Sequence, residues 1–225
     1  MLNEDSLWGY VNSEWTLHSS DYNDNGDRIL MMAEQTAQLF GKIADNLEEF
    51  AESSQYSQAE AYKYFIERMR LARPKRGGII WWNLLDGWPQ ISDAVVDYYF
   101  EKKLAYYYIR VSQQPFALMV DEYFDHGYTV YAVNDTLNTT AGEYEISDIL
   151  TGDILSAGTF SVKPNESLAL GKIRMYCSEK KMLLLKWTVD GKCSYSHYLC
   201  GQPPFSLSFY RSCFEKLKPL IAGEL

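Results

Sequence analysis

The chain has 225 residues, and its 30 acidic residues outnumber its 21 basic ones, which gives a formal net charge of −9. A protein that binds nucleic acid or an anionic membrane surface needs a basic face, so both of these partner classes are excluded. Hydrophobic residues make up 47% of the chain, which is enough to build a core. No apolar run reaches about 18 residues, and residues 1–10 lack the pattern of a signal peptide, so we expect neither a membrane span nor a leader.

The spacing of the cysteines predicts free thiols rather than a metal site. Cys177, Cys193, Cys200 and Cys213 are scattered, without the C-x-x-C spacing of a zinc site. A chain of this length needs no disulfide to hold its core, so free buried thiols are favoured, while a Cys177–Cys193 or Cys193–Cys200 bond stays open. We expect no metal ion and no organic cofactor. The cellular compartment is undetermined by the sequence.

The first hundred residues carry helical patterns. Residues 27–41 predict an amphipathic helix that begins at an Asp N-cap and ends at a glycine. A second helical region opens at Asp45 or Asn46, and Ser53 or Ser54 could cap a longer helix that runs to Leu71. A further helix is expected over residues 101–112. This part of the chain therefore reads as mostly helical.

One short strand is expected among these helices. Residues 79–82, Ile-Ile-Trp-Trp, follow two glycines and form the kind of apolar run that is typical of a buried strand. A helix, a Gly-Gly step, a buried strand, a loop and another helix follow one another, which is the order seen in α/β domains. One strand cannot make a sheet, so we interpret this region as a piece of such a domain.

After residue 112 the pattern alternates with a period of two. Asp190-Gly191 and Gly152-Asp153 are strong signals for hairpin turns. Seven short strands in this region match the number in an immunoglobulin-like sandwich. We expect them over residues 116–123, 128–134, 141–150, 153–162, 167–175, 182–189 and 193–200. A helical pattern over residues 206–221 follows.

The segment with the most chemical character follows the predicted strand. Trp81 and Trp82 end the strand, and Asp86 and Trp88 lie in the loop after it. In parallel α/β folds, loops at this end of the strands build the active site. An indole face there could stack on a sugar ring, and a carboxylate could accept a hydrogen bond from a hydroxyl group. The same residues would equally serve as core and as a turn cap.

This segment resembles glycoside hydrolase family 2, in particular its β-mannosidase-like branch. Members of that branch have Gly-Gly, a strand that ends in Trp-Gln-Leu-Asn-Asp, then Trp-Pro, Ile-Ser, Asp-Tyr-Tyr and a helix of the Lys-Ala-Leu-Tyr-Tyr type. The matching residues are Gly77-Gly78, Trp82–Asp86, Trp88-Pro89, Ile91-Ser92, Asp97–Tyr99 and Lys103–Tyr107. Weaker matches extend the resemblance over nearly the whole chain, at Trp8, Trp15, His18, Phe40-Gly41, Asp45–Phe50, Val133–Asp135, Tyr198-Leu199 and Pro204-Phe205.

The resemblance implies an α+β architecture in three parts. Residues 1–111 would be a mostly helical C-terminal fragment of a (β/α)8 barrel, with residues 79–82 as its last strand. Residues 112–202 would form an immunoglobulin-like β-sandwich, and residues 203–225 a helical tail.

The implied activity is cleavage of β-glycosides with retention of configuration. Such enzymes use two glutamates about 5 Å apart, one as nucleophile and one as general acid/base. In this family they come from the ends of the fourth and seventh barrel strands, and the fourth strand is absent here. Glu14 lies in a Ser-Glu-Trp sequence similar to the nucleophile strand, but the glycine expected nearby is missing, and the 68 residues from Glu14 to Trp82 are fewer than expected. We therefore expect no catalytic residue in this chain, and no activity from it alone.

The residues expected to bind substrate are Trp82, Asp86, Trp88, His18 and Asn83. Asn83 replaces a family glutamine, and Leu85 replaces a family asparagine, so a polar contact is lost. The preference among mannoside, galactoside and glucuronide therefore stays open.

The expected partners are a β-linked carbohydrate and the N-terminal part of the parent polypeptide. Uncovered barrel surfaces would also favour self-association. Two other functions stay open, a non-catalytic carbohydrate-binding module and a structural interaction domain.

Overall fold

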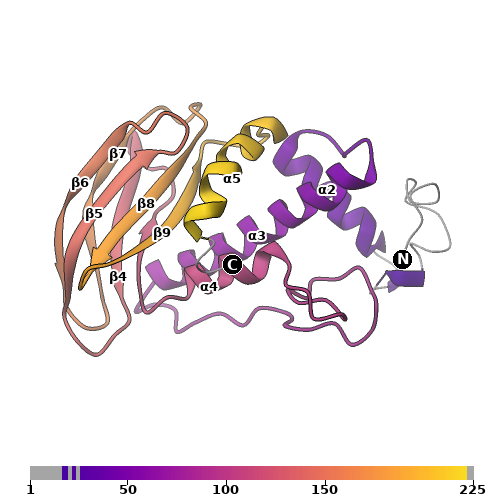
Figure 1. Cartoon of the computed structure of the whole chain (residues 1–225), viewed down its shortest axis with the longest axis horizontal. Helices are drawn as coiled ribbons and strands as arrows, with labels where there is room; N and C mark the ends of the chain where they lie inside the picture. Colours follow the sequence, from indigo (N-terminus) through magenta and orange to yellow (C-terminus); the bar gives the residue numbers. More distant parts are fainter. Residues whose placement is uncertain (1–16, 20–21, 24–25, 222–225) are drawn as a thin grey trace. The chain divides into compact units, whose positions relative to one another are not determined.

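The computed structural model describes residues 17–19, 22–23 and 26–221, and Figure 1 labels its elements. The chain divides into two compact units, and each is described by itself. Unit 1 comprises Met1–Lys63, Ile80–Tyr108 and Pro203–Leu207. Unit 2 comprises Tyr64–Ile79, Ile109–Gln202 and Ser208–Leu225.

The described residues form four α-helices of nine residues or more. They are α2 (Arg28–Phe40), α3 (Leu47–Leu71), α4 (Leu104–Ser112) and α5 (Leu207–Ile221). None of them is both long enough and apolar enough to cross a membrane.

Local chemistry explains where α2 and α3 begin and end. Helix α2 ends at Phe40, and the next residue, Gly41, has a φ of 83° that suits a glycine. The Asn46 side chain accepts a hydrogen bond from the Glu49 amide at 2.9 Å, so Asn46 caps α3. Arg68 and Arg70 lie in the last turn, where the helix dipole favours cations. Helix α3 is continuous through the serines that the sequence offered as a second cap.

Unit 1 has a small core of its own. Ile29 and Ala33 on α2 pack with Ala44 and Phe50, and all four are buried. A two-stranded ladder, β1 (Tyr22–Asn23) with β2 (Gly26–Asp27), precedes α2. The stripe of apolar residues on α2 thus faces the start of α3, as amphipathic helices require.

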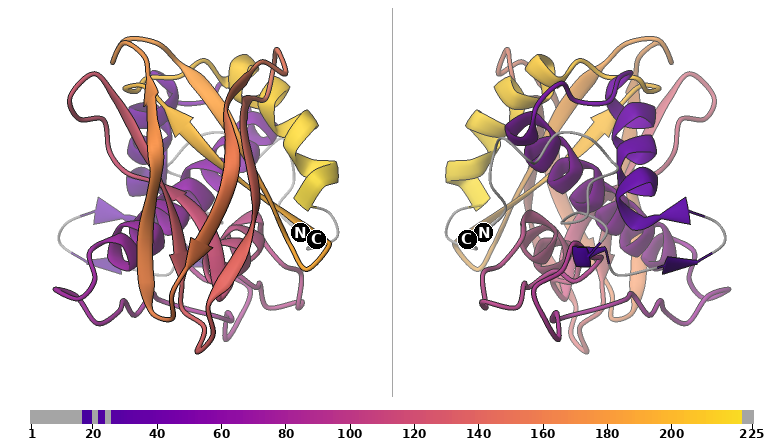
Figure 2. Two further views of the ribbon diagram at one scale, coloured as in Figure 1. Left: turned by 90° about the vertical axis from the view of Figure 1, so that its left-hand side faces the viewer. Right: turned by 90° about the vertical axis from the view of Figure 1, so that its right-hand side faces the viewer.

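Unit 2 contains a β-sandwich of seven antiparallel strands. One sheet has the order β3-β4-β7 and the other the order β6-β5-β8-β9, and Figure 2 shows the two layers. The strands are β3 (Phe116–Val120), β4 (Gly127–Asn134), β5 (Thr140–Asp148), β6 (Ile154–Val162), β7 (Glu166–Arg174), β8 (Lys181–Val189) and β9 (Lys192–Cys200). Asp190 and Gly191 both have positive φ, which is the geometry of the predicted β8–β9 hairpin turn.

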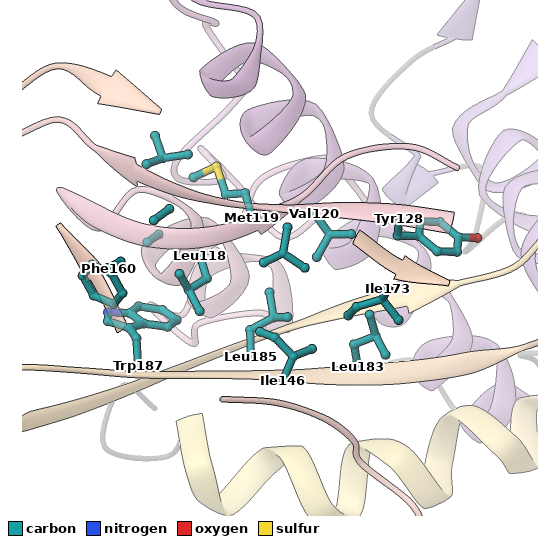
Figure 3. Close-up of a cluster of buried hydrophobic side chains, with 14 of the residues drawn as sticks. Leu118, Met119, Val120, Tyr128, Ile146, Phe160, Ile173, Leu183, Leu185 and Trp187 are labelled. Atoms are coloured by element: carbon teal, nitrogen blue, oxygen red, sulfur yellow. The ribbon is translucent and has the colours of Figure 1, made fainter. Parts of the chain in front are cut away.

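The sandwich core lies between the sheets. Leu118 and Val120 of one sheet face Ile146, Leu183 and Leu185 of the other, and all are buried (Figure 3). At one end of this core, the Phe116 and Phe160 rings stack with centroids 4.8 Å apart. Side chains from both inner faces thus fill the space between the sheets.

The expected fold class is wrong. The described chain has four helices and two antiparallel sheets that form a sandwich, rather than a mostly helical barrel fragment. Residues 79–82, the predicted last barrel strand, lie outside any strand, and Ile80 is 97% exposed. A strand needs a hydrogen-bonded neighbour, and none pairs with this segment in the described chain.

All four cysteines are free thiols. Cys200 and Cys213 are buried, whereas Cys177 and Cys193 are exposed. No disulfide therefore contributes to holding the two sheets together.

Candidate functional site

The candidate site lies in unit 1, on the irregular segment that follows residue 82. Backbone hydrogen bonds hold this segment in place. The Val96 amide donates to Leu84 O at 2.9 Å, and the Asp86 amide donates to Val96 O at 3.2 Å. On the other side, the Lys103 amide donates to Val95 O at 2.9 Å. Three short pieces, 83–86, 95–97 and 101–103, therefore form one ladder.

Asp86 is the polar centre of this segment. Its side chain is fully buried. Oδ1 accepts hydrogen bonds from Gln90 Nε2 at 2.7 Å and Ser92 Oγ at 2.5 Å. Oδ2 lies 3.6 Å from Lys103 Nζ, which also donates to Ser92 O at 3.2 Å. The carboxylate thus closes the loop over residues 86–92.

Lys103 is held in a partly desolvated position. Burial lowers the pKa of its ammonium group, while the Asp86 carboxylate acts in the opposite direction. A buried carboxylate without a cationic neighbour would be costly, so the two groups depend on each other. Sequence reasoning missed Lys103, Gln90 and Ser92 as partners of Asp86. Ser92 and Lys103 belong to the motif set, but nothing in the motif connects them to that carboxylate.

His18 and Trp88 lie against each other at the same loop. Their rings stack with centroids 5.7 Å apart and an interplanar angle of 22°. His18 Nδ1 lies 2.7 Å from Pro89 O, and the Ile91 amide donates to His18 O at 2.7 Å. Trp88 remains 40% exposed. The structure thus brings together three residues that the sequence singled out, namely His18, Asp86 and Trp88.

Trp82 and Asn83 precede this loop. The Trp82 side chain is 75% exposed, and the peptide bond between the two residues is cis. The Tyr62 hydroxyl on α3 donates to Trp82 O, which fixes the backbone beneath the indole. Burial raises the pKa of Tyr62 to about 12. Asn83 Oδ1 is buried and lacks a hydrogen-bond partner among the described residues.

Helices α2 and α3 anchor the far end of the segment through Asp93. Arg28 Nη1 lies 2.6 and 2.5 Å from the two carboxylate oxygens of Asp93. Gln58 Nε2 donates to Asp93 O at 2.7 Å. These contacts fix the chain beyond the loop, and no motif signalled them.

Several large apolar side chains between residues 80 and 100 are exposed. We call this set the apolar patch, and its members are Ile80, Trp82, Leu84, Leu85, Tyr98, Tyr99 and Phe100. Phe100 is 74% exposed with a φ of 66°, in a turn where Asp97 Oδ1 accepts from the Tyr99 and Glu101 amides. Exposed side chains of this kind are available to contact another molecule.

The remaining expectations concern a catalytic glutamate and a metal site. Glu14 lies outside the described residues. Over residues 17–19, 22–23 and 26–221, no group of three or more His, Cys, Asp or Glu side chains is arranged to hold a metal ion.

Comparison with known proteins finds similarity in structure only. No protein-family model and no curated protein sequence matches this chain. A β-D-mannosidase from Dictyoglomus thermophilum superposes with a TM-score of 0.66 and 23% identity, over 78% of this chain and 22% of that one. An exo-chitosanase from Amycolatopsis orientalis, solved with PNP-β-D-glucosamine, has a TM-score of 0.62 and 18% identity, over 81% of this chain and 22% of that one. A second structure of the same enzyme, described as an exo-β-D-glucosaminidase, has a TM-score of 0.61 and 17% identity, over 83% of this chain and 24% of that one.

These similarities establish a fold. This chain spans less than a quarter of the length of the two enzymes in these three structures, and each structure matches about four fifths of this chain. The arrangement of helices and sandwich described above is therefore one that occurs inside larger glycoside-cleaving enzymes.

Proposed function

We propose that this chain is a C-terminal portion of a retaining exo-β-glycosidase of glycoside hydrolase family 2. It would contribute an aromatic sugar-binding surface, and the rest of the enzyme would contribute the two catalytic glutamates. By itself the chain would bind sugar weakly and hydrolyse nothing. Fold alone does not fix function, so the proposal depends on the site.

The exposed indole of Trp82 is the observation that carries this proposal. A tryptophan with 75% of its surface exposed is not stabilising a core. Its backbone carbonyl accepts a hydrogen bond from Tyr62, and a hydrogen-bonded ladder begins at the next residue. A rigidly mounted aromatic face is suited to stacking on the apolar face of a pyranose.

Asp86 would support this aromatic surface rather than contact the sugar itself. With its side chain fully buried, Asp86 holds the 86–92 loop through Gln90, Ser92 and Lys103. That loop carries Trp88 and receives His18. We assign sugar contact to Trp82, Trp88 and His18, with Asn83 and Asp86 supporting them.

The expected lack of activity follows from chemistry. Retaining hydrolysis needs a nucleophile and an acid/base about 5 Å apart. Protonation of the leaving oxygen alone is commonly worth about 10²–10⁴-fold in rate. The enzymes of similar fold have more than three quarters of their length outside the matched region, which leaves room for both groups there.

The direct test is hydrolysis of nitrophenyl β-mannoside, β-galactoside, β-glucoside, β-glucuronide and β-glucosaminide. We expect no release of nitrophenol above background from this chain alone. Release that Glu14→Gln abolishes would place a complete active site in this chain and contradict the proposal.

Binding is tested separately by NMR titration of the indole NH signals with the methyl β-glycosides of the same sugars. We expect Trp82→Ala to weaken binding about fivefold, because one stacking contact is worth about 1 kcal/mol. Trp187→Tyr, inside the sandwich core, serves as the control and should leave binding unchanged. Equal effects of the two substitutions would mean that Trp82 does not contact sugar.

The apolar patch favours a second function, a structural interaction domain. Tyr99 and Phe100 project from a turn closed by hydrogen bonds to Asp97, and rigid aromatic side chains are typical anchors of protein interfaces. Capture of the remaining part of the parent enzyme by this chain, lost on Phe100→Ser, would support it. A patch that binds sugar but no polypeptide would favour the first proposal alone.

A further inference from the structure

The negative charge of the chain is concentrated in the unit that carries the candidate site. Unit 1 has 16 acidic and 5 basic residues, a net charge of −11, whereas unit 2 has 14 acidic and 16 basic residues, a net charge of +2. Residues 80–101, which include Trp82 and Trp88, contain four acidic residues and no basic one. A field of this sign attracts cationic ligands and repels anionic ones.

The buried polar side-chain atoms without a hydrogen bond at this site are acceptors. In the described part of the chain, Asn83 Oδ1 and Asp86 Oδ2 are buried and receive no hydrogen bond, although Lys103 Nζ lies 3.6 Å from Asp86 Oδ2. No buried side-chain donor of residues 80–103 is left without a partner. The site therefore offers lone pairs rather than N–H or O–H groups.

The hydrogen bond between His18 and Pro89 fixes which nitrogen of the imidazole carries the proton. His18 Nδ1 lies 2.7 Å from Pro89 O. A carbonyl oxygen can only accept, so Nδ1 must donate and therefore carries the proton. In the neutral ring, Nε2 is then left with a lone pair and can only accept. The backbone of the 86–92 loop thus selects one of the two tautomers of His18.

The second ring nitrogen of His18 is held in place but has no partner. Nδ1 and Nε2 point to nearly opposite sides of an imidazole, so Nε2 points away from Pro89 O. His18 is partly exposed, and among the described residues nothing hydrogen-bonds to Nε2. The ring stacks on Trp88, and the Ile91 amide donates to His18 O at 2.7 Å. A fixed acceptor therefore lies beside the indole of Trp88.

We propose that the sugar recognised at this surface carries a protonated amino group, as a β-linked amino sugar does, and that His18 Nε2 accepts a hydrogen bond from it. An ammonium group has donors and no acceptor, so it matches a nitrogen that can only accept, whereas a hydroxyl group satisfies either tautomer. A sugar with a carboxylate group would meet lone pairs and like charge. This assignment rests on the proposed function and names the class of its substrate.

The test compares methyl β-glycosides that differ in one group, namely those of glucosamine, glucose, N-acetylglucosamine and glucuronic acid. NMR titration of the indole NH signals at pH 7, where most of a free amine is protonated, gives each dissociation constant. We expect the glucosaminide to bind at least about fivefold more tightly than the glucoside, because hydrogen bonds to charged groups are the stronger ones. N-acetylation should remove this preference, and the glucuronide should bind most weakly.

The outcomes separate this assignment from the proposed function. Sugar binding without a preference for the glucosaminide would overturn the assignment and leave the proposed function standing. Binding of none of the four glycosides would contradict the proposed function, and the assignment with it.

His18→Asn tests the contact itself. The Asn amide can still donate to Pro89 O from the place of Nδ1, but nothing replaces Nε2. We expect the ratio of glucosaminide to glucoside affinity to fall at least about threefold. The matched control is His126→Asn, at an exposed position of unit 2 whose φ of 60° suits Asn, and it should leave the ratio unchanged. An unchanged ratio in His18→Asn would overturn the assignment to His18.

The tautomer of His18 gives a second measurement that needs no ligand. In ¹⁵N NMR spectra of the wild-type chain, the neutral ring should carry its proton on Nδ1. A proton on Nε2 would make that atom a donor and would contradict the proposal.

Discussion

Asn134 is fully buried at the end of β4, and its amide group satisfies several backbone groups at once. Nδ2 lies 2.8, 3.0 and 3.2 Å from the carbonyl oxygens of Asn138, Val162 and Lys163. Oδ1 accepts from the Thr136 amide at 3.0 Å and from its hydroxyl at 2.8 Å. One side chain thus joins the β4–β5 turn to the end of β6.

Replacing this amide by a carboxylate should be costly. In Asn134→Asp, a carboxylate oxygen would replace the two N–H donors that lie within reach of three carbonyl oxygens, and we expect a loss of about 3 kcal/mol or more in the free energy of unfolding. Urea denaturation measures it. Asn138→Asp, at an exposed position of the same turn, should change stability by less than about 0.5 kcal/mol. Equal losses would show that the buried hydrogen bonds are not the cause.

At the scale of secondary-structure elements, strands β5 and β8 approach each other closely at one glycine. Gly142 on β5 leaves no room for a side chain, since a Cβ there would lie 2.1 Å from Thr188 O and 2.9 Å from the Phe160 ring. The sequence gives no sign of this, because a glycine within a strand pattern is equally typical of a bulge.

Gly142→Ala should therefore destabilise the sandwich by about 1–3 kcal/mol, because the strands must separate or Phe160 must move. Gly78→Ala, where nothing lies within 4 Å of the new Cβ, is the control with the same change. Thermal denaturation should show a lower midpoint for the first variant only. An unchanged midpoint for Gly142→Ala would mean that the strand relaxes without cost.

The buried thiols of α5 and β9 couple stability to alkaline pH. Burial raises the pKa of Cys213 from 9.0 to about 12, and it raises the pKa of Cys200 as well. The folded chain keeps these thiols protonated where the unfolded chain ionises them. Their contribution to stability is complete below pH 9 and is lost as pH rises from 9 toward 12.

The free energy of unfolding should thus fall by up to about 1.4 kcal/mol per pH unit for each thiol above pH 9. Cys213→Ala should make this fall less steep, by the share of one thiol, in denaturation curves measured at pH 8, 9 and 10. Cys177→Ala, at an exposed position, controls for the loss of a cysteine. A slope that does not change in Cys213→Ala would contradict the assignment.

At the scale of the whole molecule, two separate cores stabilise the two units. The sandwich core centres on residues such as Leu118 and Leu185, and unit 1 has its own cluster around Ile29. Helix α3 begins in unit 1 and continues into unit 2 after Lys63. Separate cores predict separate responses to mutation.

Leu185→Ala should lower the stability of unit 2 by about 2–5 kcal/mol, and Ile29→Ala should act in the same way on unit 1. Native-state hydrogen exchange distinguishes the two, because each variant should lose protection mainly in its own unit. Equal loss of protection in β5 and β8 from both variants would show that the chain unfolds as one cooperative body.

The sequence by itself determined the seven strands of the sandwich and the approximate bounds of the helices in the chain. Alternating residues, hairpin signals and the Asn46 cap act within a few residues of one another, so local patterns suffice to predict the elements that they form. Residues 79–82 look like a buried strand in every local respect. Whether such a run becomes a strand depends on a hydrogen-bonded neighbour from elsewhere, and only the tertiary structure decided that none is present in the described chain.

For the candidate site too, the sequence indicated some residues, and the tertiary structure decided how they contact one another. Trp82, Asp86 and Trp88 could be named from their types and spacing, and His18 from the family resemblance. The contacts of Asp86 with Lys103, and of His18 with Trp88, join residues 17 and 70 positions apart, and no local pattern reports them. Burial of Asp86 and exposure of Trp82 likewise arise from packing, because a side chain's access to solvent depends on what folds over it.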